Sequence, residues 1–492
     1  MKRGRRDFLT IVGGAGAALL AAACGGSTNN ASKTATTVAT RAAATSGSAT
    51  TATGGAAATA TRAAAAVSST PSGPVKTSTV TYYGGDNGPE EMAWHKKFND
   101  DFAAAFPQYR AEDSEFATVD MFTKMQTALA SNSPLDMMFR DVSGGNTTAS
   151  LWDQGLLAPA NDVMEDVYTM IGGKDKFDSA AVNKYTIPSG ELIGVPFLAP
   201  PRLLWYRADL LQQAGLTPPA DGHWDWNFLL KAVKATHKPP EVYGMGIALA
   251  RNAATVWLTG TLVMNNGGHF LSPDLKDVVF DSAEVRETFD FVKELSAYAP
   301  PDAVTWNSAN QIDAIDRGSV AIGEYGGRPY ADLVNKSPAL VSKYFNSIIP
   351  YNKFPRSFGG AGVHALFKGK NLAGAKELAK FSMRKEQFIS YLLVSPGQYP
   401  AIIPAYGADP SYTGSPVLKA YDPKMLANST EAGKNAFNFL QEGPGWKLNL
   451  KAGTLDGSLF LAEIVQKVVV GKESTASAVT AGANAIRDIM KG

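Results

Sequence analysis

The feature that most constrains this chain is a long segment that cannot form a core. Residues 26–74 consist almost wholly of Ala, Thr, Ser and Gly and include no aromatic residue. Val38 and Val67 are the only bulky aliphatic side chains in the segment. So little apolar surface cannot offset the entropy lost when a chain becomes ordered. A disordered tether is therefore predicted here, and the folded part is predicted to begin near Val75.

The N-terminus has the composition of an export signal. Arg5 and Arg6 lie in a basic stretch, and residues 11–23 form an uncharged apolar run. This run is too short to span a bilayer, which needs roughly 20 apolar residues. A basic stretch followed by a short apolar run is typical of a signal peptide, here over residues 1–23. The paired arginines, followed by Asp7-Phe8-Leu9, resemble the twin-arginine signal that exports folded proteins.

The apolar run ends at Cys24, the only cysteine of the chain. The sequence Leu19-Leu20-Ala21-Ala22-Ala23-Cys24-Gly25 resembles a lipoprotein signal, in which the cysteine is lipidated and becomes the mature N-terminus. Ala21 stands where that signal usually has Leu. The prediction is a lipid anchor on Cys24 followed by a tether over residues 24–74. The alternative is simple cleavage near Ala23, which leaves a free protein.

Composition and motifs exclude several functional classes. A chain of 492 residues predicts two or three domains or lobes. The formal net charge of +1 gives no electrostatic footprint for nucleic-acid binding. The five histidines lack metal-ligand spacing, and no nucleophile-elbow, zinc-protease, phosphate-loop or dinucleotide motif is present. The sequence therefore predicts no metal, no organic cofactor and no enzymatic activity.

Strand-like and helix-like stretches alternate along the rest of the chain, as in α/β proteins. Residues 78–83 are β-branched or aromatic and predict a strand that stops at the following glycines. Trp94, Phe98, Phe102 and Phe106 recur every four residues, which predicts the buried face of a helix.

A second predicted strand, over residues 135–139, is followed by Arg140 and Asp141. In open α/β sheets, ligands bind beyond the carboxyl ends of the strands. Arg140 and Asp141 are therefore candidate ligand-binding residues. The alternative is a solvated surface pair.

An ordered set of short motifs occupies the middle of the chain. They are Gly194-Val195-Pro196-Phe197, Leu204-Trp205-Tyr206-Arg207-Ala208-Asp209-Leu210-Leu211, Ala214-Gly215-Leu216, Pro218-Pro219 and Trp224. In this order they resemble a signature of the extracellular solute-binding proteins of ABC importers, in particular the sugar-binding, maltose-binding-protein-like family. Arg207 replaces the usual Asn, and His223 replaces the usual Thr, which removes a good helix N-cap.

Further motifs extend the resemblance over nearly the whole mature chain. They are Trp152-x-x-x-Gly155-Leu156-Leu157-x-Pro159, the strand-like run from Arg317 to Gly326, Ser357-Phe358-Gly359-Gly360, the helix-like run from Ala373 to Phe381, and Gly397-Gln398-Tyr399-Pro400-Ala401. No single one of these motifs is specific, but the ordered set is.

The resemblance implies a periplasmic-binding-protein-like fold of two α/β lobes, joined by three chain crossings, that closes on a ligand. By analogy, lobe 1 takes residues 75–198 and 355–396, and lobe 2 takes residues 199–354 and 397–492. The crossings are expected near residues 196–205, 350–358 and 395–401. The implied function is capture of a mono- or oligosaccharide outside the cytoplasm by a monomer. The permease subunits of an ABC importer are the implied partner, and the membrane is reached through the lipid.

Candidate ligand-binding residues were chosen for sugar chemistry, because sugars present apolar ring faces and hydroxyl groups. The expected set is Tyr83, Asp86, Arg140, Asp141, Trp205, Trp257, Glu324, Tyr325, Arg328, Gly359, Gln398 and Tyr399. For Asp86 the alternative is an Asx turn, and for Trp257 it is core packing. Trp224 is expected in the core.

Two other functions remain open at this stage. An exported carbohydrate-active hydrolase is an alternative, because a catalytic carboxylate pair need not be adjacent in sequence. A ligand sensor with the same fold shares every feature described above.

Near-neutral charge favours an uncharged polyol over a phosphate or a polyamine. Iron requires clustered tyrosines, whereas Tyr82 and Tyr83 are adjacent on a strand and point to opposite faces.

Overall fold

The computed structural model describes residues 77–86, 88–117, 121–131, 135–219 and 222–491. The predicted export arginines Arg5 and Arg6, the predicted lipidation site Cys24 and the predicted tether lie outside these residues. Within the described ranges, no helix has both the length and the apolar character needed to cross a membrane.

Lobe 1 is built on a five-stranded mixed sheet with the strand order β2-β1-β3-β10-β4. β1 pairs in parallel with β2 and β3, and β10 runs antiparallel to β3 and β4. The strands are β1 (Ser78–Asp86), β2 (Tyr109–Ala117), β3 (Met137–Met138), β4 (Val195–Leu198) and β10 (Gly362–Leu366). The helices are α2 (Pro89–Ala105), α3 (Met121–Ala130), α4 (Asn146–Asp153), α5 (Asn161–Ile171), α6 (Ser179–Asn183), α13 (Leu372–Ser382) and α14 (Lys385–Leu392).

An aromatic cluster forms the core of lobe 1. Trp94, Phe98 and Phe102 lie on one face of α2 and are buried. The rings of Trp94 and Phe98 stack at 4.6 Å, and Phe139 packs against both. The predicted aromatic stripe is therefore confirmed as core packing. β1 is longer than expected: it continues through Gly84 and Gly85, because β2 pairs with it along its whole length.

Lobe 2 is built on a four-stranded sheet with the strand order β6-β7-β5-β8. β5 runs antiparallel to β7 and β8, and β6 pairs in parallel with β7. The strands are β5 (Leu203–Arg207), β6 (Tyr243–Gly246), β7 (Val320–Tyr325) and β8 (Tyr344–Ile348). The helices are α7 (Ala208–Gln213), α8 (Trp226–Thr236), α9 (Ala253–Asn265), α10 (Ala283–Ser296), α11 (Ser308–Asp316) and α12 (Pro329–Lys336).

The sequence predicts that α8 lacks a good N-cap, because His223 replaces the usual Thr, but the helix has one. Asp225 is the N-cap, and its carboxylate accepts a hydrogen bond from the backbone N–H of Phe228. The Thr that the family has in place of His223 is therefore not needed for capping. Trp224, next to the cap, is 1% exposed, which confirms its prediction as a core residue.

A two-stranded parallel ribbon joins the lobes. β9 (Ser357–Phe358) pairs with β11 (Ala436–Phe437). β9 lies on the path from β8 in lobe 2 to β10 in lobe 1. The first crossing connects β4 to β5 through residues 199–202.

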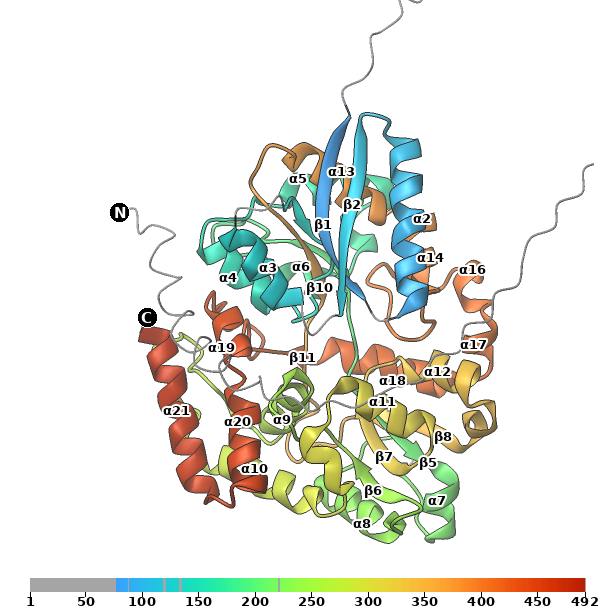
Figure 1. The fold of residues 1–492 in the computed structure, drawn as a ribbon, viewed down its shortest axis with the longest axis vertical. Helices are drawn as coiled ribbons and strands as arrows, with labels where there is room; N and C mark the ends of the chain where they lie inside the picture. Colours follow the sequence, from blue (N-terminus) through green and yellow to red (C-terminus); the bar gives the residue numbers. More distant parts are fainter. Residues whose placement is uncertain (1–76, 87, 118–120, 132–134, 220–221, 492) are drawn as a thin grey trace, which may run out of the picture. The chain divides into compact units, whose positions relative to one another are not determined.

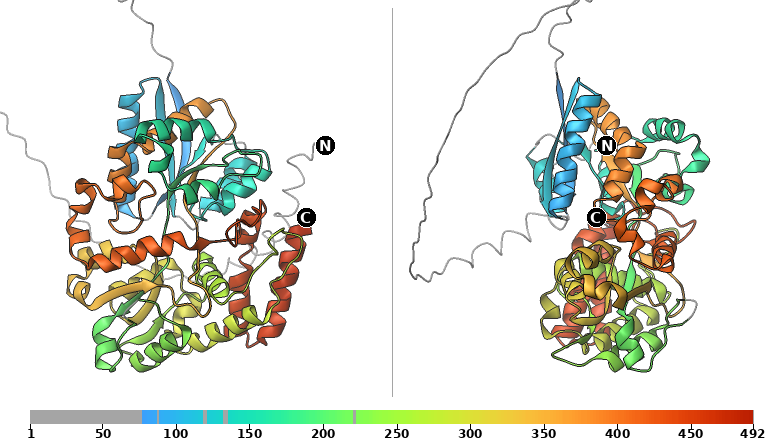
Figure 2. Two further views of the ribbon diagram at one scale, coloured as in Figure 1. Left: turned by 180° about the vertical axis from the view of Figure 1, so that it is seen from behind. Right: turned by 90° about the vertical axis from the view of Figure 1, so that its right-hand side faces the viewer.

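The C-terminal segment contacts both lobes (Figures 1 and 2). α15 and α16 pack against α14, and α19 packs against α4, both in lobe 1. In lobe 2, α17 packs against α12, α18 packs against β8, and α20 packs against α9. Assigning residues 397–492 to lobe 2 alone therefore does not describe these contacts. The segment comprises α15 (Pro404–Gly407), α16 (Pro410–Thr413), α17 (Pro416–Lys419), α18 (Pro423–Lys434), α19 (Ala452–Ser458), α20 (Phe460–Val465) and α21 (Thr475–Lys491).

The stretch expected to form the third crossing, 395–401, lies against residues of both lobes. Ala401 bridges to Leu198 of β4, and the carbonyl of Ile402 accepts a hydrogen bond from the backbone N–H of Asp178. Both contacts are with lobe 1, whereas Gly397, earlier in the same stretch, packs closely against Gly327 and Tyr330 of lobe 2.

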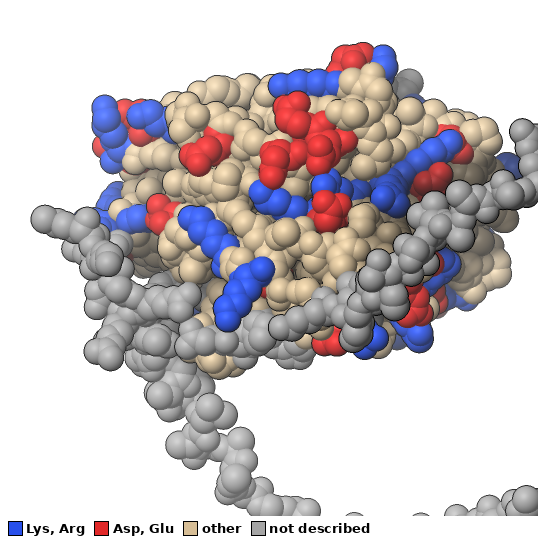
Figure 3. Space-filling view, turned by 90° about the horizontal axis from the view of Figure 1, so that it is seen from above, with Lys and Arg blue, Asp and Glu red and all other residues tan. Residues whose placement is uncertain are grey.

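The surface carries both signs of charge. The end of lobe 1 shows Lys and Arg side chains interspersed with Asp and Glu (Figure 3). The exposed ion pairs of the described residues include Lys96 with Asp100 and Lys376 with Asp162. Such pairs contribute little stability, roughly 0–1 kcal/mol each. Positive and negative side chains are mixed on this face, so it has no large region of a single charge.

Candidate ligand-binding site

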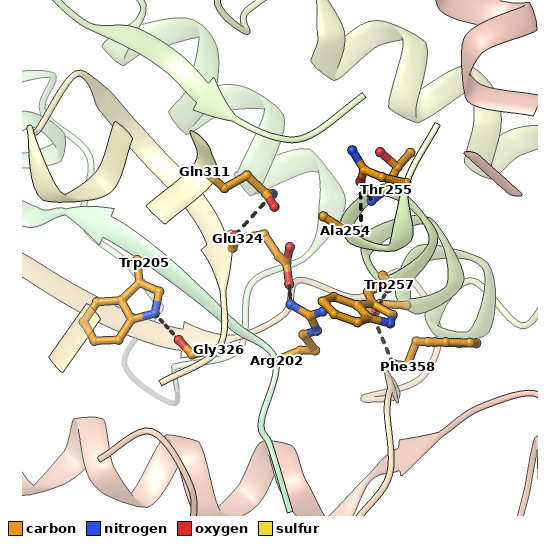
Figure 4. A network of polar contacts seen from close by, with 11 residues as sticks. Arg202, Trp205, Ala254, Thr255, Trp257, Gln311, Glu324, Gly326 and Phe358 are labelled. Carbon is orange, nitrogen blue, oxygen red and sulfur yellow. Dashed lines mark hydrogen bonds and ion pairs between the residues drawn. The ribbon is translucent and has the colours of Figure 1, made fainter. Parts of the chain in front are cut away.

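One group of polar side chains meets beside the first crossing (Figure 4). Arg202 follows two prolines in this crossing, and its Nη1 donates to Oε1 of Glu324 at 3.0 Å. The guanidinium lies 4.3 Å from the ring centroid of Trp257, close enough for a cation–π interaction. The arrangement joins an aromatic ring, a cation and a carboxylate in one place.

Secondary structure explains how Glu324 comes to this place. Glu324 is near the end of β7, a buried strand, and lies opposite Leu204 of β5. Its carboxylate is buried, and its backbone carbonyl accepts a hydrogen bond from the side-chain amide of Gln311. Burial raises the pKa of Glu324, and the nearby Arg202 opposes that shift. Oε2 of Glu324 has no hydrogen bond of good geometry in the described part of the chain, although the side-chain amide of Gln311 lies close enough to lower the pKa of this carboxyl.

Trp257 lies on α9, most of whose residues are buried. Asn252 caps the N-terminus of this helix by accepting hydrogen bonds from two backbone N–H groups. Trp257 itself is only half-buried. A fixed helix thus holds a half-buried indole ring that packs partly against the core and partly against Arg202.

A second polar group surrounds Arg140. The guanidinium donates to the carboxylate of Glu91 and to the hydroxyl of Tyr399. Burial lowers the pKa of Arg140. The charge of Glu91 and the hydroxyl groups of Tyr391 and Tyr399 outweigh this effect, so the net shift is upward. The side-chain amide of Gln398 donates to the same Tyr399 hydroxyl. Arg140 has a positive φ of 57°, which is uncommon for a residue other than glycine.

Tyr325 links the two groups electrostatically. Its pKa is raised to about 12 by burial, although the neighbouring cations Arg202 and Arg328 act in the opposite direction, and Tyr399 raises it further. Arg328 also forms an ion pair with Asp332 at 3.1 Å. A Cβ added to Gly88, in lobe 1, would lie 3.3 Å from Nη2 of Arg328. Arg328 thus extends from lobe 2 to the loop that follows β1.

Two predicted ligand residues have their side chains engaged elsewhere. The Asp141 carboxylate accepts four hydrogen bonds, from the backbone N–H and hydroxyl groups of Ser143 and Thr148. It is 1% exposed, so it is not the solvated surface residue of the alternative interpretation either. Trp205 is fully buried, packs edge-on against Tyr330, and donates its indole N–H to the carbonyl of Gly326. The Asp141 carboxylate and the Trp205 indole N–H are therefore already hydrogen-bonded within the protein.

The remaining predicted residues are placed as follows. Tyr83 is half-buried and packs against the small cluster that contains Met125 and Leu135. Asp86 pairs through its backbone with Ala117 at the end of β1, and its side chain lies outside the described atoms. Gly359 lies just after β9, where its carbonyl accepts a hydrogen bond from Nζ of Lys184.

The sequence analysis missed Arg202, Gln311, Glu91 and Lys184. For Arg202 a signal exists, since it is the only charged residue between Pro196 and Trp205. Glu91 precedes Trp94 by three residues, so it shares the buried face of the aromatic stripe. Lys184 and Gln311 carry no local signal. A shallow surface depression on α8, lined by Asn227, Leu230, Lys231, Lys234 and Ala235, contains none of these residues.

Comparison with known proteins places this geometry in context. The family described as "Bacterial extracellular solute-binding protein" matches residues 85–387. A curated relative, the putative ABC transporter periplasmic-binding protein YcjN of Escherichia coli (strain K12), is 21% identical over 306 residues. The match covers 61% of this chain and 67% of that relative.

Solved structures show the same fold. Maltose-bound MalE3 of T. maritima has a TM-score of 0.69 at 18% identity, covering 84% of this chain and 99% of that one. A sugar transporter of Arthrobacter chlorophenolicus A6 with bound laminaribiose has a TM-score of 0.69 at 19% identity, again covering 84% and 99%. The predicted two-lobed α/β fold is therefore confirmed.

Proposed function

Because the chain belongs to the family of bacterial extracellular solute-binding proteins, we propose that it captures a mono- or oligosaccharide and delivers it to an ABC importer. The ligand lies between the lobes, against Trp257 and Glu324 on one side and the Arg140 group on the other. Binding energy then favours closure, since a ligand touches both groups of residues only when the lobes are together.

The observation that carries this proposal is the buried acceptor Oε2 of Glu324 beside the ring of Trp257. A sugar has apolar ring faces that stack on aromatic rings, and hydroxyl groups that donate to carboxylates. Trp257 supplies the ring, while Oε2 of Glu324 supplies the acceptor. A buried acceptor without a well-formed hydrogen bond costs about 1–3 kcal/mol, and a ligand hydroxyl removes that cost.

The charges of the site favour an uncharged ligand. Glu324 is paired with Arg202, Glu91 with Arg140 and Asp332 with Arg328. Each carboxylate is thus balanced by an arginine. The solved relatives named above hold maltose and laminaribiose according to their descriptions, and both sugars are uncharged.

The carboxylates also bear on the hydrolase alternative. A glycosidase needs one carboxyl group that acts as an acid and a second that acts as a base or nucleophile. In this site Glu91 and Glu324 each pair with an arginine, an arrangement that favours a hydrogen-bonding role. We therefore propose release of the sugar unchanged. Product formation from a bound oligosaccharide at enzyme-like rates, about 1–10³ s⁻¹, would refute this part of the proposal.

Export and anchoring complete the proposal. Arg5 and Arg6 begin a twin-arginine-like signal, and Cys24 carries the lipid that holds a monomer at the outer face of the cell membrane. The family is extracellular by its description, which supports the location.

Calorimetric titration after a thermal-shift screen of neutral sugars tests the proposal. A bound sugar raises the melting temperature by mass action. Trp257→Ala is expected to weaken binding by about 10-fold, because an aromatic stacking contact is worth roughly 1.4 kcal/mol. Trp152→Ala removes another half-buried Trp, on α4, and serves as the matched control that keeps wild-type affinity. If no sugar binds, or if both variants bind like the wild type, the site is wrong.

A further inference from the structure

A lysine from lobe 1 is attached to both strands of the inter-lobe ribbon. Lys184 follows α6, and its Nζ donates to the carbonyls of Gly359 and Ala436 at 3.1 and 3.0 Å. Gly359 immediately follows β9 and Ala436 begins β11. The strands are also bonded to each other, since the backbone N–H of Gly359 donates to the carbonyl of Phe437 at 2.7 Å. One amine therefore holds both strands of the ribbon to lobe 1.

The residues that follow Gly359 and Ala436 along the chain are held to lobe 1 by other hydrogen bonds. The hydroxyl of Tyr185 donates to the carbonyls of Ala361 and Gly144, at 2.8 and 2.9 Å. The side-chain amide of Asn438 donates to the same Gly144 carbonyl. A rotation of the ribbon relative to lobe 1 is thus concentrated near Gly359 and Ala436, and it must stretch the two bonds of Lys184.

The surroundings of Lys184 lack a negative charge. No carboxylate lies within ion-pair distance of Lys184 in the described part of the chain. Nζ lies 5.8 Å from the ring centroid of Phe437, and the guanidinium of Arg356 lies 5.8 Å from the same centroid. Other titratable groups near the ribbon, among the described residues, are Tyr185, beside Lys184, the His269 and Glu442 pair, which adjoins Arg356, and Glu431, which accepts a hydrogen bond from Asn435 and pairs with Lys434. The Lys184 side chain is half-buried, and desolvation of its amine lowers its pKa to about 7.

We propose that Lys184 is a proton-sensitive latch: its neutral amine holds the β9–β11 ribbon against lobe 1, and protonation loosens the ribbon. A neutral amine has two N–H groups, one for each carbonyl. An ammonium group makes the same two bonds but must also lose the hydration of a charge that no carboxylate balances. Protonation therefore favours an arrangement in which Lys184 is exposed to water.

The sign of the pH dependence follows from linkage. The latched arrangement has the lower Lys184 pKa, about 7 against roughly 10.5 in water. The latched arrangement therefore gains stability as the pH rises between these two values. The equilibrium constant between the released and the latched arrangement rises by at most about tenfold per pH unit. Below about pH 7 both arrangements are protonated, and the dependence vanishes.

Amide hydrogen exchange of the ribbon tests the latch without any ligand. Exchange at Ser357 and Gly359 is measured at pH 6.5 and 8.5 and corrected for the intrinsic rates. Wild-type protection is expected to rise by about 20-fold over this range. Lys184→Met, which cannot titrate, and Lys184→Arg, which stays charged, are expected to abolish the pH dependence. If corrected wild-type protection is constant, or if Lys184→Met retains the dependence, the latch is refuted.

The coupling of the latch to solute capture rests on the proposed function. On the further premise that closed lobes hold the ribbon in the latched arrangement, binding of a neutral sugar from the screen at pH 8 is expected to release a proton. Calorimetry in two buffers of different ionisation enthalpy measures this release, and Lys184→Met is expected to remove it. Proton uptake instead would refute the latch and indicate an anionic ligand beside Lys184. If no sugar binds, the proposed function fails, while the exchange experiment still decides on the latch.

Discussion

Replacing Glu324 by Gln examines the central feature of the proposed site. The substitution keeps the shape of the side chain and keeps an oxygen that can accept from Arg202. It replaces Oε2 by an amide that donates, so a ligand hydroxyl loses its acceptor. It also removes the charge, which makes any remaining hydrogen bond weaker.

The expected loss of affinity follows from the hydrogen bond to a charged group. Such a bond is worth about 1.5–3 kcal/mol, which corresponds to roughly 10- to 150-fold in the dissociation constant. A stability effect accompanies it. Because the pKa of Glu324 is raised in the folded state, the wild type loses stability as the pH rises from about 4 through that pKa. The variant lacks this loss, so its stability relative to the wild type increases over the same window.

Titration calorimetry measures the affinity and urea unfolding measures the stability. Glu442→Gln is the matched control: Glu442 is also buried with a raised pKa, but it accepts hydrogen bonds from the backbone of Phe270 and Leu271. The control is expected to change stability and to leave affinity unchanged. Equal affinity of Glu324→Gln and the wild type for every sugar that binds would refute the assignment of Glu324 to the ligand.

Four further predictions follow from packing and anchoring. Trp224→Ala is expected to lower the free energy of unfolding by about 3–5 kcal/mol in urea titration, because it empties a buried site. Glu91→Ala leaves Arg140 charged, buried and unpaired, and is expected to cost about 3–5 kcal/mol by the same assay; Glu91→Gln is expected to cost less. Gly360→Ala places a Cβ 2.7 Å from the carbonyl of Gly144, so we expect a loss of about 1–3 kcal/mol in thermal unfolding. Cys24→Ala is expected to move the protein from the membrane to the soluble fraction of cells; a variant that stays with the membrane, together with a wild type that carries no lipid, refutes the anchor.

Features that depend on local periodicity could be predicted from the sequence. The four-residue spacing of aromatic residues defined the buried face of α2, since both the pattern and the contact lie on one helix. The strand β7 lies within the run from Arg317 to Gly326, and the run from Ala373 to Phe381 lies within the helix α13. In each case the residues that form the pattern are also the residues that form the structure.

Features that depend on the order of the strands could not be predicted. Trp205 lies at the end of a crossing, which suggested a ligand contact. Its strand, β5, is paired on both edges, by β7 and β8, and Tyr330 covers the ring. Asp141 follows a strand end, as ligand residues often do. Its side chain instead binds the first turn of α4, and the nearby Ser143 and Thr148 are a local indication of that role.

Arg202 shows why a site of this kind is hard to find from the sequence and which clue remains. Its partners Trp257 and Glu324 are 55 and 122 positions away, and no periodic pattern connects residues on a crossing, a helix and a strand. A charged residue within an otherwise apolar crossing must nevertheless be neutralised or solvated, because burying an unpaired charge costs several kcal/mol. The only charge between Pro196 and Trp205 therefore implies a carboxylate from elsewhere in the chain. Glu324 supplies this carboxylate from β7, the strand that pairs with β5 directly after the crossing.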